Sequence, residues 1–227
     1  MLSRPVSPRR TTRTALAGGL ALGLAGVLRA AAGPAVPADA AAALRKAVTR
    51  YSDGSAHAAG FTQTYTPAGF TNARRETGTV WIQSPQRLRF TYGPPQNTIY
   101  TYDAGEGRFF SPEDRQLTVR RLTPDERARL PIVFLTDPAE LASSYEIASE
   151  TGPDSSSRLL LTPRTKRGDL AWLRLTMGPE GDVRELSYED GSGNRTEFRF
   201  AAWRREAAKP PSEFRITGPP GTRIVEN

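Results

Sequence analysis

The chain of 227 residues contains no cysteine. Thiol catalysis and attachment of a lipid to a cysteine of this chain are therefore excluded, and a domain outside the cytoplasm would have to be stable without disulfides. With His57 as its one histidine, the chain also offers a poor ligand set for zinc. Burial of a hydrophobic core is what remains to stabilise the fold.

Sequence patterns of catalytic sites are missing as well. We find no Gly-x-Ser-x-Gly nucleophile elbow, no His-Glu-x-x-His, no phosphate-binding glycine loop and no Gly-x-Gly-x-x-Gly. The acid pairs Glu113-Asp114 and Asp125-Glu126 fall in a turn and at a helix start, where capping accounts for them. The sequence thus predicts neither an enzyme nor a bound cofactor or metal.

Residues 1–38 have the three-part pattern of a secretory signal peptide. Four arginines within residues 4–13 come without any acid, and an uninterrupted run of Ala, Leu, Gly and Val covers residues 15–28. This run is too short to span a bilayer comfortably, which disfavours a membrane anchor. Cleavage near Ala32, Ala38 or Ala40 is expected after export by the Sec route. The pair Arg9-Arg10 leaves twin-arginine export as the alternative.

Residues 39–227 are predicted to form a single domain with a different charge balance. Five arginines and no acid lie in residues 1–38, so removal of that segment lowers the formal net charge from +7 to +2. A nucleic-acid partner, which the basic character of the whole chain would suggest, loses its main support. We expect a monomer whose remaining length is enough to bury a sizeable core.

This domain is predicted to contain one helix followed by many short strands. The spacing of apolar residues places the helix at residues 39–51, with Asp39 as its N-cap. Alternation of apolar and polar residues predicts strands at 61–65, 80–83, 88–92, 98–102, 108–110, 116–121, 145–149, 158–162, 171–177, 183–189, 196–201 and 214–216.

Two capping signatures interrupt the β pattern in the middle of the chain. The segments Thr123–Glu126 and Asp137–Glu140 predict short helices at about 124–130 and 138–144. Between them lies an apolar loop that we interpret as a lid, formed by Leu130, Ile132, Val133, Phe134 and Leu135.

These patterns predict a mostly β fold of the α+β class, an incomplete antiparallel β-barrel or strongly curved sheet with a helical lid over its concave face. A filled core would explain a strongly apolar concave face, and so would a cavity that takes lipid chains, where each buried methylene contributes about 0.8 kcal/mol. The residues that we assign to a lipid-binding cavity are Trp81, Leu88, Phe90, Tyr92, Phe110, Leu160, Leu173, Leu175, Phe198 and Phe200.

Several short motifs, in their order and spacing, resemble the LolA family of periplasmic lipoprotein carriers over about residues 40–226. They include Ser55–Gln63, Gly78–Ile82, Leu88-Arg89-Phe90 and Phe109–Pro112. The motifs Leu161–Arg164, Phe214–Ile216 and Pro219–Thr222 continue the resemblance towards the C-terminus.

The resemblance implies a carrier in the periplasm that holds the acyl chains of lipoproteins in its cavity. Such a carrier receives them from an inner-membrane ABC transporter of the lipoprotein-release type and delivers them to an outer-membrane acceptor, where one is present. Many family members have an arginine before the proline that follows the tryptophan strand, where it latches the lid. This chain has Ser84 there, and a hydroxyl cannot span the same distance or offer five donors.

Two other functions stay open at this point. The chain could bind or sense another envelope lipid or glycolipid without handing over lipoproteins, and Ser84 is the best sequence support for that alternative. It could also hydrolyse envelope material, although only the predicted export supports a hydrolase.

Overall fold

The computed structural model describes residues 36–123, 141, 143–152, 156–165 and 170–226. These residues belong to one compact unit. Residues 1–35 of the predicted signal peptide, the predicted helix at 124–130, most of that at 138–144 and all the predicted lid residues lie outside the described residues.

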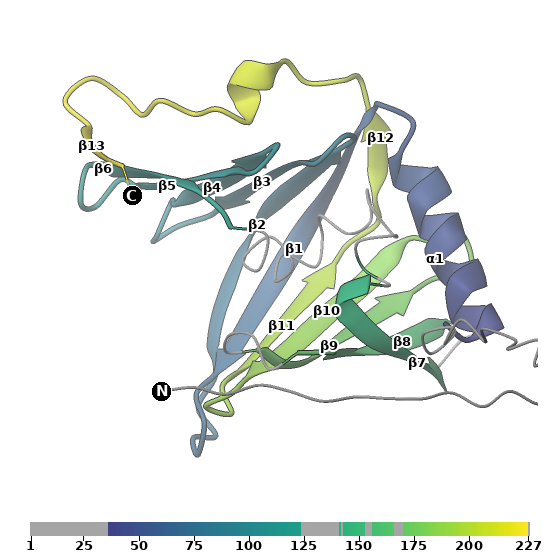
Figure 1. The fold of residues 1–227 in the computed structure, drawn as a ribbon. Coiled ribbons are helices and arrows are strands. Elements are labelled where there is room, and N and C mark those ends of the chain that lie inside the picture. The colour runs from purple at the N-terminus through teal and green to yellow at the C-terminus, as the bar shows by residue number, and fades with distance from the viewer. Residues whose placement is uncertain (1–35, 124–140, 142, 153–155, 166–169, 227) are drawn as a thin grey trace, which may run out of the picture. The chain divides into compact units, whose positions relative to one another are not determined.

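A helix and a large sheet make up the described part of the chain (Figure 1). Helix α1 spans Ala38–Tyr51 and the short 3₁₀ helix η2 spans Pro211–Glu213. The strands are β1 (Ala56–Thr66), β2 (Arg74–Gln83), β3 (Arg87–Tyr92), β4 (Ile99–Asp103), β5 (Glu106–Ser111), β6 (Gln116–Arg121), β7 (Tyr145–Thr151), β8 (Ser157–Pro163), β9 (Leu170–Met177), β10 (Val183–Asp190), β11 (Arg195–Phe200), β12 (Arg204–Glu206) and β13 (Arg223–Glu226).

The strands belong to one 13-stranded sheet in the order β13-β6-β5-β4-β3-β2-β1-β11-β10-β9-β8-β7, with β12 paired to β1 beside this path. Neighbours are antiparallel except β13, which runs parallel to β6. Strand β1 therefore lies in the middle of the sheet. Strands β2–β6 follow one another on one side of it, and β11–β7 lie on the other side, with β11 next to β1. Within the described residues β7 and β13 do not pair, so the curved sheet is unclosed, as Figure 1 shows.

The predicted mostly β fold, an unclosed and strongly curved antiparallel sheet with a helix, is confirmed, whereas the helical lid falls outside the described residues. Most predicted strands differ from the observed ones by a few residues at their ends. Three local predictions are wrong. Asp39 lies inside the first turn of α1, and Pro37 is the N-cap. Strand β1 begins at Ala56, well before the predicted strand, so that His57 lies within it. Phe214–Ile216 is not a strand, because it follows η2, and the C-terminal strand is β13.

Register divides the side chains between an inner, concave face and an outer face. Residues that are directly opposite in neighbouring strands share a face, and alternate residues of a strand change face. Leu88 pairs with Ile82 and Tyr102, and all three are buried in the main core. Arg89, the next residue, pairs with Trp81 and Thr101 on the outer face.

Helix α1 covers one end of the inner face. Its buried stripe consists of Ala40, Ala43, Leu44, Ala47 and Tyr51, which belong to the same core cluster as the inner-face side chains of β7–β10. Three alanines in this stripe let the helix approach the sheet closely. This part of the core therefore lies between α1 and the half of the sheet formed by β7–β10, and the same cluster continues onto β1–β4.

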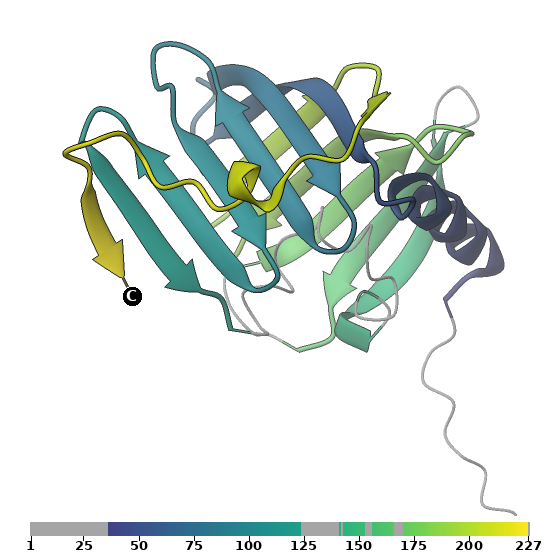
Figure 2. The ribbon, with the colours of Figure 1, turned by 90° about the horizontal axis from the view of Figure 1, so that it is seen from above.

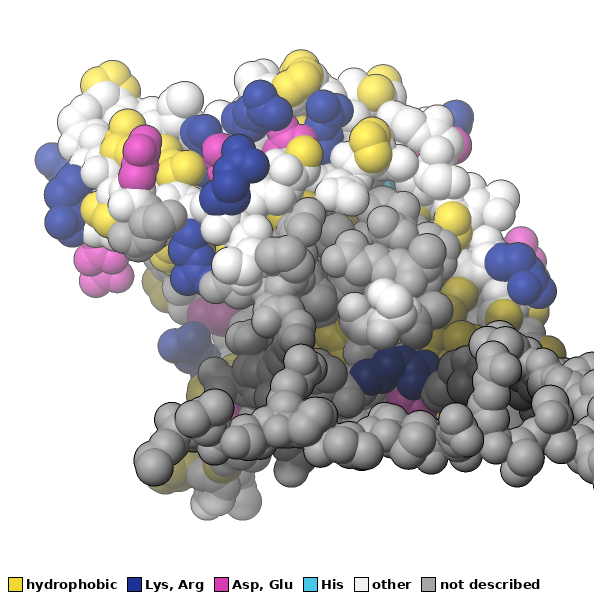
Figure 3. All heavy atoms as spheres, viewed as in Figure 1, with side chains coloured by type: hydrophobic (Ala, Val, Ile, Leu, Met, Phe, Trp, Pro, Cys, Tyr) yellow, Lys and Arg dark blue, Asp and Glu magenta, His cyan; other side chains and the backbone are white. Residues whose placement is uncertain are grey.

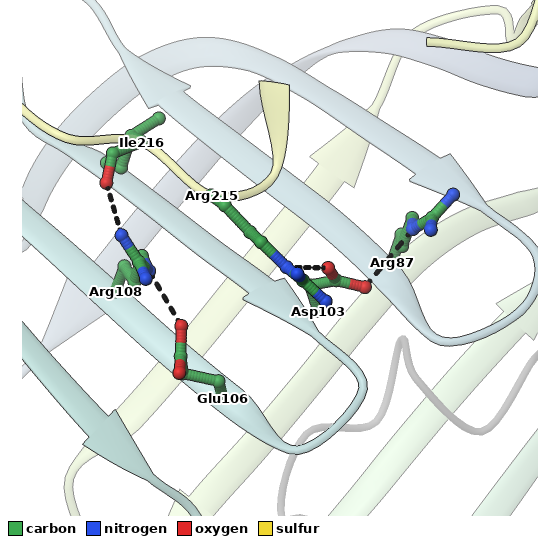
Figure 4. A network of polar contacts seen from close by, with 6 residues as sticks. All are labelled: Arg87, Asp103, Glu106, Arg108, Arg215 and Ile216. Carbon is green, nitrogen blue, oxygen red and sulfur yellow. Dashed lines mark hydrogen bonds and ion pairs between the residues drawn. The ribbon is translucent and has the colours of Figure 1, made fainter. Parts of the chain in front are cut away.

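The C-terminal segment, residues 207–222, crosses the outer face of β3–β5 (Figures 1 and 2). Phe214 of this segment is buried, and the Arg87 guanidinium of β3 lies over its ring. Asp103 accepts hydrogen bonds from Arg87 Nε at 3.1 Å and from Arg215 Nε at 2.5 Å, and Arg108 Nη1 donates to the Ile216 carbonyl at 2.9 Å (Figure 4). These bonds fix the segment to strands that are about 100 residues earlier in the sequence.

Lys and Arg side chains on this part of the surface lie beside Asp and Glu side chains and are not gathered by sign (Figure 3). Arg108 Nε, for example, is 2.7 Å from Glu106 Oε1, and Arg89 Nη1 is 2.5 Å from Glu213 Oε2. The face covered by the C-terminal segment is therefore electrically mixed.

Gly78 in β2 makes room for the ring of Phe61 in β1. A Cβ at this position would lie 2.2 Å from the Thr91 carbonyl oxygen and 2.8 Å from Phe61 Cε1. At Gly60, in the neighbouring strand, an added Cβ would meet nothing closer than 3.9 Å. The close contact at Gly78 is what allows an aromatic side chain to fill the centre of the inner face.

We predict that Gly78→Ala lowers the free energy of unfolding by about 1–3 kcal/mol, because strands must shift to remove the overlap. Chemical denaturation followed by circular dichroism measures the loss. Gly60→Ala is the matched control and should change stability by less than about 1 kcal/mol. Equal effects of the two substitutions would show that Gly78 is not tightly packed.

The absence of natural cysteine allows the two faces to be tested by labelling. We predict that Leu160→Cys, on the outer face, reacts with a maleimide at least about tenfold faster than Leu161→Cys, which replaces a fully buried inner residue. Labelling rates of the folded proteins, followed by mass spectrometry, give the comparison. Faster reaction at residue 161 would reverse the assignment of faces.

Candidate lipid-binding face

The inner face carries a continuous apolar surface that runs across both halves of the sheet. Strands β1–β3 contribute Phe61, Val80, Ile82, Leu88 and Phe90. Strands β8–β11 contribute Leu159, Leu161, Leu173, Leu175, Leu186 and Phe198. Because neighbouring strands pair these residues with one another, side chains from distant parts of the sequence form one surface.

Aromatic rings occupy the centre of this surface. The ring of Phe61 lies 5.1 Å from those of Phe90 and Tyr92 and 5.8 Å from that of Phe198, measured between centroids. Phe198 stacks with Phe200 at 6.2 Å. Edge-on and offset contacts of this kind stabilise aromatic clusters beyond the area that they bury. The cluster links strands β1, β3 and β11.

Tyrosines border the apolar surface on the side of β3 and β4. Tyr92 donates its hydroxyl to Gln63 Oε1 at 2.6 Å. Burial raises the pKa of Tyr100 to about 12 and also raises the pKa of Tyr92, because the phenolate would lose its hydration. Tyr92, Tyr100 and Phe200 are only partly buried where they pack against the core. The border therefore combines apolar rings with neutral hydroxyls.

At the other end, α1 is fixed to the sheet through Tyr51 and Trp203. The Val183 N–H donates to the Tyr51 hydroxyl at 3.2 Å, and Trp203 Nε1 donates to the Val183 carbonyl at 2.7 Å. The two rings are 5.3 Å apart. Burial raises the pKa of Tyr51 to about 12. This end of the inner face is closed by the helix.

The structure brings most of the predicted cavity residues together on the inner face. Leu88, Phe90, Leu173, Leu175 and Phe198 belong to the core cluster, and Tyr92 and Phe200 pack against it. Leu88 is 2% exposed and Phe90 is 8% exposed, so both are less accessible than Tyr92 and Phe200. Contact of these residues with a lipid stays a prediction.

Three predicted cavity residues lie on the outer face instead. Trp81 is placed between Arg89 and Lys209, whose cationic groups are 5.3 and 4.7 Å from its ring centroid. Leu160 pairs with Arg174 and Ala148. Phe110 lines a hollow of about 340 Å³ with Ile99 and Ile216 of the C-terminal segment.

Two of these misplacements have one physical cause. The C-terminal segment covers the outer face at Trp81 and Phe110, so a large apolar side chain there does not identify the inner face. Leu160 is a large apolar residue that is only half-buried on the outer face. In β2 the smaller neighbours Val80 and Ile82 face inward, and in β8 the inner residues are Leu159 and Leu161. The predicted set also omits Phe61 and Leu186, although alternation from Phe198 through the β10–β11 pairing indicates Leu186.

His57 is buried in β1 and has a structural partner. Its Nε2 lies 3.1 Å from Asp53 Oδ1, and its ring packs edge-on against Tyr51. A hydrogen bond from Arg205 Nε, 2.7 Å long, is the largest of the effects that lower the pKa of Asp53. Among the described residues no group of three or more His, Asp or Glu side chains is arranged to hold a metal.

No helix in the described ranges combines the length and the apolar character that a membrane-crossing helix needs. In the part of the chain that the structure describes, the inner face carries the residues of the hydrophobic core cluster. It could accept a hydrophobic ligand through van der Waals contact, with hydroxyl groups at its border.

Comparison with known proteins agrees with this geometry. The outer-membrane lipoprotein carrier protein of Xanthomonas axonopodis pv. citri (strain 306) is 30% identical over 167 residues, which are 73% of this chain and 79% of that protein. The carrier of the same name from Alkalilimnicola ehrlichii is 29% identical over 187 residues, 82% of this chain and 85% of that protein.

An uncharacterized conserved protein from Thermus thermophilus shares the fold, with a TM-score of 0.53 at 10% identity over 83% of this chain and 99% of that one. Residues 53–217 match the family described as outer membrane lipoprotein carrier protein LolA. This match covers more than half of the chain, from the residues before β1 to the segment that crosses the outer face, and the chain therefore belongs to the LolA family.

Proposed function

We propose that this protein is a lipoprotein carrier of the periplasm, which binds the acyl chains of its cargo on the inner face of the sheet. The observation that carries the proposal is the continuous apolar surface formed by β1–β3 and β8–β11 in a member of the LolA family. An acyl chain on this surface would be shielded from water, at about 0.8 kcal/mol for each buried methylene. No bond of the cargo has to be made or broken.

The route of the cargo follows from the same proposal. The carrier would take lipoproteins from an inner-membrane ABC transporter and deliver them to an outer-membrane acceptor, where one exists. Residues 1–38 would direct export and be removed. The names of the curated relatives support the cargo and its destination; the transporter and the acceptor are parts of the proposal.

Access to the inner face is expected at its partly buried border. Tyr92, Tyr100 and Phe200 have the exposure that a first contact with a hydrophobic ligand requires, whereas Leu88 and Phe90 lie deeper. Ser84, half-buried after β2, stays our candidate for a weaker lid latch than an arginine would give. The lid residues Leu130, Ile132, Val133, Phe134 and Leu135 remain part of the proposed binding site.

We predict that Phe200→Glu abolishes cargo binding while the protein remains folded, because a carboxylate at the apolar border must stay hydrated. Inner-membrane vesicles that contain the cognate transporter and a tagged lipoprotein are incubated with ATP and the purified protein. A soluble one-to-one complex should form with the unchanged protein and fall at least about tenfold with the variant.

Leu160→Glu is the matched control, because Leu160 is also half-buried but lies on the outer face. This variant should form the soluble complex with the lipoprotein as the unchanged protein does. Circular dichroism must show that both variants are folded. Loss of release by both or by neither would contradict the assignment of the binding face.

A second arm distinguishes the carrier from a binder of another envelope lipid. Lipids are extracted from the purified protein and identified by mass spectrometry. Lipoprotein acyl chains, or no lipid, agree with a carrier that has delivered its cargo. A stoichiometric lipid of another kind, together with failure to release lipoproteins, would overturn the proposal in favour of that alternative.

A further inference from the structure

A cleft lies on the solvent side of α1, next to the stripe that packs on the sheet. It has a volume of about 610 Å³ and is lined on the helix by Arg45, Lys46, Thr49 and Arg50. Pro179 and Glu180, in the turn between β9 and β10, form the opposite wall. Its volume lies within the range of small-ligand sites.

The two walls of this cleft are held together by close packing. Gly181 in the turn has φ of +78°, and a Cβ there would lie 2.6 Å from the Lys46 carbonyl carbon. Lys46 Nζ donates to the Pro179 carbonyl at 2.9 Å. The turn is itself closed by the Gly181 N–H, which donates to the Gly178 carbonyl at 3.0 Å. The cleft is therefore a preformed feature of the helix–sheet packing.

Its charge is strongly unbalanced. Arg45, Lys46 and Arg50 bring three cations to the helix wall, and no acid lies within 4.0 Å of them in the described ranges. Among the described residues that line the cleft, Glu180 is the one acid. Asp182, the next acid of the turn, is engaged by Arg184, whose Nε lies 3.2 Å from Asp182 Oδ2.

Arg50 adds an observation that the fold does not explain. Its Nε is buried, yet it has no hydrogen-bond partner in the described structure. A buried donor without a partner is costly, by about 1–3 kcal/mol. The Arg50 guanidinium interacts with the Tyr51 hydroxyl, and because Arg50 also lines the cleft, an anion there would give the group a further acceptor. The Thr49 hydroxyl on the same wall can donate as well.

We propose that this cleft binds phosphate groups and docks the protein on an anionic phospholipid surface. Arginine and lysine with a hydroxyl donor form the donor set that suits phosphate oxygens. The side chains emerge from one side of α1 over about two turns, so they can reach several headgroups that lie in one plane. The opposite side of the helix packs on the sheet, which would leave the helix between the sheet and the membrane.

A lipid surface fits better than an acidic peptide for a geometric reason. The basic residues lie close together at positions 45, 46 and 50 of one helix instead of following an extended groove, and the cleft that they line has room for a phosphate headgroup. This inference concerns a different face from the cargo-binding surface, and it stands whether or not that surface carries lipoproteins.

The experiment measures binding to vesicles. Protein purified after export is mixed with vesicles of phosphatidylcholine alone or with about 30% phosphatidylglycerol, and the bound fraction is determined by co-sedimentation. We expect binding only to the anionic vesicles and a decrease with added salt. Arg45→Gln and Lys46→Gln should each weaken it about fivefold, which corresponds to the loss of one basic residue at such a surface.

Two further variants sharpen the test. Glu180→Gln should strengthen binding, because it removes the one acid of the cleft. Arg75→Gln is the control for net charge, since Arg75 is exposed at the start of β2, and it should have little effect. Equal weakening by Arg75→Gln and Arg45→Gln would overturn the proposal, because binding would then reflect overall charge.

A direct titration with phosphate separates the two sources of phosphate. Inorganic phosphate at millimolar concentration is added to the protein alone, and binding is followed by calorimetry. Weak binding of free phosphate with firm retention on anionic vesicles supports docking on lipid. Tight binding of free phosphate without retention on vesicles would overturn the lipid assignment, and no binding in either arm would overturn the site itself.

Discussion

The packing of Phe61 against Gly78 is the contact on which the rest of the structure depends. Strand β1 pairs with β2 on one side and β11 on the other, so its inward side chains hold the two halves of the sheet together. Phe61 reaches Phe90 in one half and Phe198 in the other. A smaller residue there would leave a cavity between the halves, and a larger one at 78 would push β2 away. The aromatic centre of the inner face, where both halves of the sheet meet, depends on this contact.

Much of the fold can be predicted because alternation is a local property. The strand Gln116–Arg121 is predicted with its observed ends, and the meander spacing is sufficient to indicate one curved sheet. The C-terminal region cannot be derived in this way. Phe214 and Ile216 alternate like a strand, but Phe214 is buried by packing on the outer face, and the intervening arginine pairs with Asp103. Only the tertiary structure reveals that partner.

The candidate site is predictable in part for the same reason. Sequence alternation identifies which residues share a face, but it does not say which of the two faces is inside. The predicted face is correct for Leu88 and Phe198 and incorrect for Trp81 and Leu160, whose outer positions lie beside arginine or lysine side chains. A basic residue at a paired position on the same face, such as Arg174 opposite Leu160, is a useful sign of an outer face.

The outer face also explains how a chain without disulfides keeps its C-terminal segment in place. Asp103 is 4% exposed and lies between two guanidinium groups. A buried carboxylate with two such partners is costly to separate from either, because the charge would lose its compensation. Gln83 adds a pair of bonds to Lys209, with its amide oxygen accepting from the backbone N–H and its amide nitrogen donating to the carbonyl.

The parallel strand at the end of the sheet has a consequence for self-association. An exposed edge with free N–H and carbonyl groups is a template on which a second chain can add a strand. Strand β13 occupies that edge of β6, is only four residues long and carries Arg223 and Glu226. Short, charged edges disfavour the stacking of sheets from one molecule to the next. The C-terminal strand thereby protects a molecule with a large apolar face against fibrous aggregation along this edge.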